Sequence, residues 1–252
     1  MTKQNHIFAF YDTHLPIISL SKELVPYIIS DETLYHRLVR VLRLRVGESC
    51  VLFNAGNYAE FSILEITKKT VEGELKERGV QQKYTPHISF LLPLLKREAL
   101  EHALYGLVQA GVNEIYLVET DNAYRSVRDH ERIRLEHIMR NAAEQAKYFY
   151  IPLLHGAVSL QKLVPTMREK GVQIIFCDPV GQPCSTVLPS LSDHTSYALM
   201  IGPENDLTSS EKKILIDAGV LFLSLTPTIL RAESAAMIGA AMMRAWFFTS
   251  KK

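Results

Sequence analysis

The stretch YALMIGPENDLTSSEKK, residues 197–213, decides the fold because it connects an apolar strand to a helix through a polar loop. The apolar run ends at Gly202-Pro203, and Thr208 with Glu211 has the Thr-x-x-Glu spacing of a capping box, which predicts where the helix begins. Gly, Pro, Asn and Asp are common in ordinary turns. Loops at the carboxyl ends of parallel strands also bind ligands. The stretch alone leaves both interpretations open.

Strands and helices alternate along the chain after about residue 86. Apolar runs predict strands at 87–95, 113–120, 172–179, 197–204 and 220–225, and apolar residues at helical spacing predict helices at 96–110, 131–148, 160–170, 208–218 and from 232. Such an alternation indicates an α/β domain with a parallel sheet that helices cover on both faces. By position, three loops are candidates for ligand binding: Asp178 onward, 202–207 and 226–229.

The first part of the chain, to about residue 74, is expected to be mostly β with one short helix. CVLFNAG and AEFSILEI predict two strands joined by a turn, and residues 30–47 predict a helix with Leu34, Leu38 and Val41 or Leu42 on its buried face. Residues 72–86 are polar and charged, which favours a linker, with an edge strand as the alternative. We therefore expect two domains, 1–74 and 75–252.

The charge balance excludes a protein with a bulk positive field. The 252 residues include 28 Lys and Arg against 27 Asp and Glu, a net charge of +1, so nucleic-acid binding would depend on local clusters. The densest basic stretch contains Arg37, Arg40, Arg43 and Arg45. It is interpreted either as a cluster that binds nucleic acid or as a solvated helix face.

The cysteines and the apolar segments predict a cytoplasmic protein without metal or membrane span. Three scattered cysteines suit neither a disulfide framework nor a zinc site, and the histidines form no tight cluster. The amino-terminal stretch lacks the apolar core of a signal peptide, and residues 235–248 are shorter than the roughly 20 residues of a membrane helix.

The common catalytic fingerprints are missing, while the last predicted helix has an unusual composition. The sequence contains no G-x-G-x-x-G after a strand, no G-x-x-x-x-G-K-[ST] and no G-x-S-x-G. Small residues lie along one helical face and permit close approach of another backbone, or the helix is simply buried; they are Ala232, Ala235, Ala236, Gly239 and Ala240. Arg231 precedes this helix at its amino end, where the helix dipole opposes a cation, which suggests an anionic or polar partner.

Four segments together resemble the 16S ribosomal RNA uracil-N3 methyltransferase family: HRLVRVLRLRVGESCVLFNAGN, IMRNAAEQAK, LMIGPENDLTSSE and LFLSLTPTILRAESAAMIGA. This family belongs to the SPOUT, or trefoil-knot, methyltransferases. The resemblance runs through essentially the whole chain in the same order. It implies a carboxyl-terminal SPOUT α/β-knot domain and an amino-terminal PUA-like β-barrel.

The resemblance also implies S-adenosylmethionine as cofactor, a homodimer, and a uridine near the 3′ end of 16S rRNA in the small ribosomal subunit as substrate. It places the cofactor against Asp178, Ile201, Gly202, Pro203, Glu204, Leu225, Thr226, Ile229 and Leu230. Arg231 would stabilise charge that develops on uracil, and Glu204 would accept a hydrogen bond from cofactor or base. Arg140 would join the amino-terminal arginines in binding RNA.

The chain departs from the family pattern at the loops themselves. Asn205 and Asp206 stand where the family usually has two glycines, and Thr226 and Thr228 replace a glycine and an arginine. These departures leave two alternatives: a knotted RNA-binding protein without activity, or a SPOUT methyltransferase that acts on another RNA position. A small-molecule α/β enzyme is a more distant alternative, because it would leave the amino-terminal module unexplained.

Overall fold

The computed structural model describes residues 7–16, 23–123, 129–191 and 196–249, and its contacts divide the chain into two units. The amino-terminal unit comprises Met1–Gln82 and Ala143–Ile151, and the carboxyl-terminal unit comprises Lys83–Ala142 and Pro152–Lys252. The sequence placed the boundary after residue 74. The structure places it after Gln82, and a later segment of the chain returns to the first unit.

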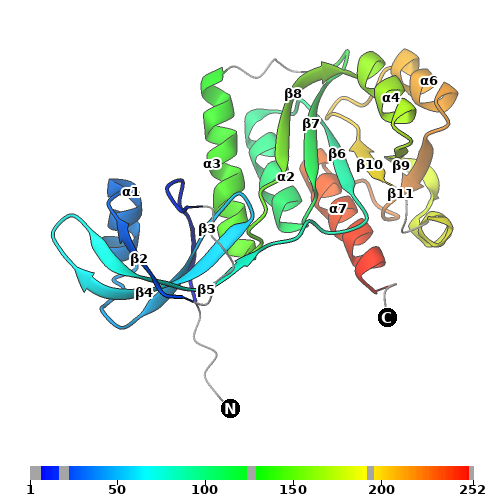
Figure 1. Ribbon diagram of the computed structural model, residues 1–252. Helices are drawn as coiled ribbons and strands as arrows, with labels where there is room; N and C mark the ends of the chain where they lie inside the picture. The colour runs from blue at the N-terminus through cyan, green and yellow to red at the C-terminus, as the bar shows by residue number, and fades with distance from the viewer. Residues whose placement is uncertain (1–6, 17–22, 124–128, 192–195, 250–252) are drawn as a thin grey trace. The chain divides into compact units, whose positions relative to one another are not determined.

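The amino-terminal unit contains a five-stranded sheet in the order β1-β3-β4-β5-β2 (Figure 1). Its strands are β1 (Ala9–Tyr11), β2 (Val25–Ile29), β3 (Ser49–Asn54), β4 (Asn57–Ile66) and β5 (Val71–Val80). The predicted turn joins β3 to β4, with Ala55 and Gly56 at positive φ. A buried apolar core that includes Phe10, Leu52 and Phe61 lies against this sheet.

The predicted linker at residues 72–86 is wrong over its first part, because Val71–Val80 is strand β5. The alternative, an edge strand, is right in part: residues 71–75 pair with both β4 and β2, whereas residues 76–80 pair only with β4 among the described strands. Val71, Gly73 and Leu75 are buried, while the charged residues between them are half-exposed. The alternation was present in the sequence, but two apolar residues and a glycine were too weak a signal among so many charges.

The short helix of this unit begins as predicted and then changes its geometry. Asp31 caps α1 (Glu32–Tyr35) by accepting a hydrogen bond from the Leu34 N–H, and a π-helical segment (His36–Val41) follows. Leu34 and Leu38 are buried, and Leu42 packs against the core. Val41 is 61% exposed, because the wider π-helical turn rotates it away from the predicted face.

The carboxyl-terminal unit contains a six-stranded parallel sheet in the order β11-β9-β10-β6-β7-β8, which confirms the predicted α/β class. Its strands are β6 (Ile88–Pro93), β7 (Glu114–Glu119), β8 (Leu153–Ser159), β9 (Gln173–Pro183), β10 (Tyr197–Ile201) and β11 (Leu221–Ser224). The helices are α2 (Arg97–Gln109), α3 (Asp129–Ala146), α4 (Leu160–Glu169), α5 (Cys184–Val187), the 3-10 turn Leu188–Ser190, α6 (Ser209–Asp217) and α7 (Ala232–Thr249). The sequence missed β8, α5 and the 3-10 turn.

Strand β10 is buried on both faces and separates two groups of helices (Figure 1). Ala198 and Met200 belong to the core shared with α4 and α6. On the other face Tyr197 stacks on Phe247 of α7, with ring centroids 5.2 Å apart. The predicted parallel sheet is therefore covered on both faces.

The predicted small-residue face of α7 allows the close approach that the sequence suggested. Ala236, Gly239 and Ala240 are buried. A Cβ atom at Gly239 would lie 3.0 Å from Cδ2 of Leu199, so a larger residue would push the helix away from β10. Ala235 is only half-buried. Within the described residues, no helix has the length and apolar character needed to cross a membrane.

Candidate functional site

A cavity of about 870 Å³ lies at the carboxyl edge of the parallel sheet. Four segments line it: the start of α2, the end region of β9, the loop after β10, and the loop between β11 and α7. The chain proceeds from β6 to β7 and β8 on one side and places β9 and β11 on the other, with β10 next to β6. The cavity thus lies where the strand order reverses, as ligand sites in open α/β sheets do.

All the residues that the sequence analysis assigned to the cofactor or to catalysis line this one cavity. They are Asp178, Ile201, Gly202, Pro203, Glu204, Leu225, Thr226, Ile229, Leu230 and Arg231. The structure therefore brings together three loops that are up to about 50 residues apart in the chain, which is the positional prediction made from strand ends.

The contribution of α2 to the cavity was not predicted from the sequence. Lys96, Glu98, Ala99 and His102 line it from the first turns of this helix. The sequence indicates that α2 begins at the carboxyl edge of the sheet, because this helix follows a strand. It does not indicate which loops lie next to the helix. Helix α2 faces these loops because β6 lies next to β10 in the sheet. This strand order is a property of the tertiary structure.

The cavity combines apolar walls with carboxylates. Phe176, Ile201 and Leu225 supply apolar surface, and Glu233 adds a carboxylate from the first turn of α7. Cys177 also lines it, and desolvation by burial raises the pKa of its thiol to about 12. The thiol is therefore protonated at neutral pH and contributes no charge.

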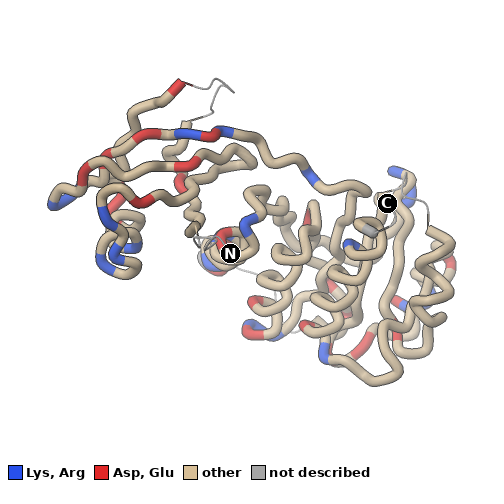
Figure 2. The backbone as a smooth tube through the Cα atoms, turned by 90° about the horizontal axis from the view of Figure 1, so that it is seen from below, with Lys and Arg blue, Asp and Glu red and all other residues tan. Residues whose placement is uncertain are grey.

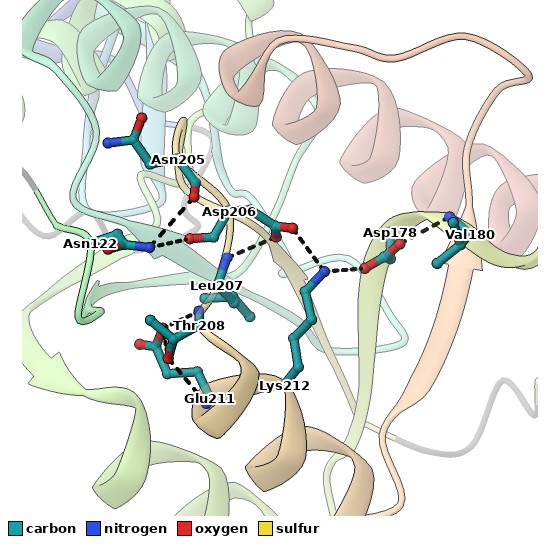
Figure 3. Close-up of polar contacts among 9 residues, drawn as sticks. All are labelled: Asn122, Asp178, Val180, Asn205, Asp206, Leu207, Thr208, Glu211 and Lys212. Carbon is teal, nitrogen blue, oxygen red and sulfur yellow. Dashed lines mark hydrogen bonds and ion pairs between the residues drawn. The ribbon is translucent and has the colours of Figure 1, made fainter.

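Hydrogen bonds with two other segments hold the loop after β10 in place. The Glu204 carboxylate accepts a hydrogen bond from the backbone N–H of Lys96, with Oε1 and N 2.9 Å apart. Asn122 Nδ2 donates to the carbonyl oxygen of Asp206 at 3.0 Å (Figure 3). Asp206 adopts φ +60°, a left-handed conformation that Asp tolerates better than most residues. Glu204 therefore stabilises the conformation of the loop after β10.

The predicted capping box is present at the start of α6. Thr208 accepts a hydrogen bond from the Glu211 N–H, and the Glu211 side chain accepts one from the Thr208 N–H at 2.9 Å. Glu211 is fully buried, and its second carboxylate oxygen accepts from the N–H of Asp121 at 2.9 Å. The cap thus also attaches α6 to the loop after β7.

The loop between β11 and α7 closes on itself. The Thr226 hydroxyl donates to the Thr228 carbonyl oxygen at 2.8 Å, and the Ser224 hydroxyl donates to the Thr226 carbonyl oxygen at 3.2 Å. Arg231 ends the loop with an exposed side chain, and its carbonyl oxygen accepts the Ala235 N–H in the first bond of α7. Ile229 is 86% exposed at the cavity mouth.

The arginines assigned to RNA have different surroundings. Arg40, Arg43 and Arg45 are exposed, and the basic stretch appears as successive blue segments in Figure 2. Arg37 instead forms an ion pair with Glu144, and Arg140 is half-buried on α3. The sequence could not reveal the partner of Arg37, because Glu144 lies 107 residues further along the chain.

A parallel α/β sheet with a cavity of this kind at its switch point is typical of proteins that bind small-molecule ligands. A family model described as an RNA methyltransferase domain matches residues 82–244, and one described as an RNA methyltransferase PUA domain matches residues 31–76. The chain belongs to this RNA methyltransferase family. The predicted fold class, a SPOUT α/β domain with a parallel sheet preceded by a PUA-like domain, is thereby confirmed. Closure of the amino-terminal strands into a barrel and the trefoil knot stay predictions.

Similar proteins cover nearly the full chain. The ribosomal RNA small subunit methyltransferase E of Buchnera aphidicola is 24% identical over 88% of this chain and 88% of its own. That of Mycobacterium bovis is 25% identical over 85% and 84%. A crystal structure of this methyltransferase from Neisseria gonorrhoeae, bound to S-adenosyl methionine, has a TM-score of 0.80 at 21% identity and covers 95% of this chain and 98% of its own.

Proposed function

We propose that this protein transfers a methyl group from S-adenosylmethionine to N3 of a uridine in 16S rRNA of the small ribosomal subunit. The observation that carries the proposal is the cavity at the switch point, within a chain that belongs to the RNA methyltransferase family. The named relatives support small-subunit rRNA as the substrate, and the neighbour from Neisseria gonorrhoeae supports the cofactor. A cytoplasmic location follows from a ribosomal substrate.

The residues of the cavity fit this cofactor. The cavity volume of about 870 Å³ is within the range of about 300–1,000 Å³ typical of small-molecule sites. Ile201, Leu225 and Leu230 provide apolar surface for a base, and the Glu233 carboxylate suits hydroxyl groups and a positive charge. The thiol of Cys177, whose pKa is raised, is neutral and adds no competing anion.

The reaction requires the uracil N3 to lose its proton as the N–C bond forms. When bound, the cofactor supplies an electrophilic methyl group on a sulfonium sulfur. Arg231 lines the cavity with an exposed side chain, and in this proposal it stabilises the negative charge that develops on the uracil carbonyl oxygens. Glu204 keeps one carboxylate oxygen on the Lys96 N–H, which holds the loop and leaves its other oxygen as a hydrogen-bond acceptor. Alignment of the base in this pocket supplies much of the rate.

The arginines of the amino-terminal unit provide phosphate contacts. Arg40, Arg43 and Arg45 are exposed on one short segment, so each side chain is accessible to a phosphate. Arg140, on α3 of the carboxyl-terminal unit, is a further candidate for a phosphate contact. Such contacts make affinity for RNA fall as salt rises. A uridine within a folded subunit also has to be unpaired or flipped before N3 can react.

A homodimer is part of this proposal. Helix α7 carries exposed apolar side chains on its surface, with Met237 45% and Phe248 73% exposed. Apolar residues of this size on one helix suit a contact with a second copy. Sedimentation of the purified protein tests the dimer independently of catalysis.

The test begins with calorimetric titration of S-adenosylmethionine, followed by mapping of methylated uridine in small-subunit rRNA. We expect one site per chain, methylation by the wild type, and loss of methylation in Arg231→Ala with fold and cofactor binding retained. Arg168→Ala is the matched control, since Arg168 is exposed on α4 and is not a lining residue of the cavity.

The outcomes separate the alternatives. A folded protein that binds no S-adenosylmethionine, with or without RNA, would overturn the proposal in favour of an RNA-binding protein without activity. Binding with methylation at a different RNA position would retain the enzyme and change its substrate. Near wild-type turnover of Arg231→Ala would remove this arginine from the catalytic residues.

A further inference from the structure

The ammonium group of Lys212 lies between carboxylates of two different loops of the cavity (Figure 3). Its Nζ atom is 3.2 Å from Oδ2 of Asp178, in β9, and 2.8 Å from Oδ2 of Asp206, in the loop after β10. Both aspartates line the cavity, whereas Lys212 itself is on α6 behind them. Lys212 was not among the residues assigned from sequence.

Asp178 requires a charged partner because its side chain is only 6% exposed. It lies where the pairing of β9 with β11 is interrupted: Phe222 pairs with Phe176, but Leu223 pairs with Gln182. One oxygen of Asp178 accepts the Val180 N–H at 2.9 Å, and the other meets Lys212. A buried carboxylate without such a partner is unfavourable.

Lys212 occupies a helical position that does not favour a cation by itself. It is in the first turn of α6, where its backbone N–H bonds to the carbonyl oxygen of the cap residue Thr208, and the helix dipole there opposes positive charge. The two carboxylates reverse this preference. Hydrogen bonding to Asp206, followed by the contacts with Asp178, raises the pKa of Lys212, so the ammonium form is kept.

Asp206 connects this ion pair to the backbone of the loop after β10. Its backbone is left-handed, with φ +60°, and its Oδ1 accepts the Leu207 N–H at 2.7 Å. A Cβ atom built on Gly202 would be 3.5 Å from the same Oδ1, so the carboxylate lies directly beside the first residue of the loop. A substitution that frees this side chain therefore affects the cavity wall at Gly202.

We propose that Lys212 is a positioning residue, which fixes the β9 bulge and the loop after β10 against each other and so sets the shape of the cofactor site. The identity of the ligand rests on the proposed function, whereas the coupling of the two loops does not. The charged bridge holds the side chain of Asp206, whose backbone is left-handed, in one orientation at the cavity wall.

The test compares Lys212→Met, Lys212→Arg and Lys213→Met. Methionine keeps the length of the side chain without its charge. Lys213 is the matched control, because it is the next residue of the same helix and pairs with the exposed Asp217, at 2.9 Å. Hydrogen–deuterium exchange is followed in peptides that cover residues 178–183 and 202–208, and S-adenosylmethionine binding is followed by calorimetry.

We expect both loop peptides of Lys212→Met to exchange several-fold faster, while peptides of β6 and α2 stay unchanged. Affinity for S-adenosylmethionine should fall about tenfold, as expected when a ligand has to order its own loops. Lys212→Arg should restore much of both properties, since it restores the charge. Lys213→Met should match the wild type in both.

Unchanged exchange in both loops of folded Lys212→Met would overturn the proposal. Faster exchange with unchanged cofactor affinity would also overturn it, because the coupling would then have no effect on the site. If the wild type itself binds no S-adenosylmethionine, the proposed function fails, and the exchange data alone decide whether Lys212 couples the loops.

Discussion

Replacement of Arg37 by methionine is expected to destabilise the amino-terminal unit and to leave its electrostatic affinity for RNA unchanged. Arg37 Nη1 is 3.0 Å from Glu144 Oε1, and its other terminal nitrogen pairs with Oε2 in a bidentate contact. The same Oε1 also accepts the Tyr11 N–H at 2.9 Å. The pair therefore joins the helical segment, β1 and residues 143–151 of one unit.

The magnitude follows from the burial of the two partners. The Glu144 side chain is 4% exposed and that of Arg37 is 37% exposed, so the loss leaves a buried carboxylate with one backbone donor. Breaking a fully buried pair costs about 3–5 kcal/mol. Solvent screening of the half-exposed guanidinium reduces this to about 2 kcal/mol, and loss of its position 5.2 Å above the Phe10 ring adds about 0.5 kcal/mol.

Urea denaturation followed by far-UV circular dichroism measures the stability, and hydrogen exchange in residues 143–151 locates the change. Arg40→Met is the matched control, because Arg40 is exposed three residues further along the same segment. Its stability should change by less than about 0.5 kcal/mol. It should instead lower the slope of log affinity for rRNA against log salt by about 1, as expected for one phosphate contact.

The reverse result would refute the reasoning. If Arg37→Met kept its stability and lost salt dependence, the ion pair with Glu144 would be dispensable and Arg37 would bind RNA, as the sequence analysis first assigned. If both variants lost salt dependence without loss of stability, the whole segment would be a phosphate-binding surface.

Two further predictions concern the carboxyl-terminal unit. Gly181→Ala should destabilise it by about 3 kcal/mol or more, because the new Cβ would lie 2.5 Å from the backbone nitrogen of Leu223, and backbone cannot move aside as a flexible side chain can. Gly156→Ala, at a strand glycine with nothing within 4 Å of its Cβ position, is the control for the same urea titration and should be neutral within about 0.5 kcal/mol. Hydrogen bonds from Arg134 lower the pKa of Glu101 below its ordinary value of 4.5, so the stability that this pair provides should be complete above that pH and be lost as the pH falls through the lowered pKa. Arg134→Gln should therefore be less stable than the wild type at pH 7, with the difference shrinking towards pH 3; a difference that is constant across this range would assign the effect to packing.

The sequence predicted the elements whose signals are local. The cap of α6 at Thr208, the ends of α2 and α4 before Gly111 and Gly171, and the apolar strands of the parallel sheet all depend on neighbouring residues, and the structure has each of them. Strand β5 was predicted only as the alternative to a linker, because its alternation is carried by only Val71 and Leu75 around a glycine. The sequence left open whether Val41 or Leu42 is on the buried face, because a π-helical turn leaves no clear mark in a sequence, and the structure selects Leu42.

The sequence by itself determined the class of the protein and the loops that could bind a ligand, since these depend on where strands end and helices begin. Only the tertiary structure decided that these loops share one cavity with α2, that Arg37 pairs with Glu144, and that Lys212 bridges Asp178 and Asp206. The physical reason is that such contacts join residues far apart in the chain. Their energies depend on burial and on distances of a few ångströms, which the order of strands in the sheet sets and local sequence does not.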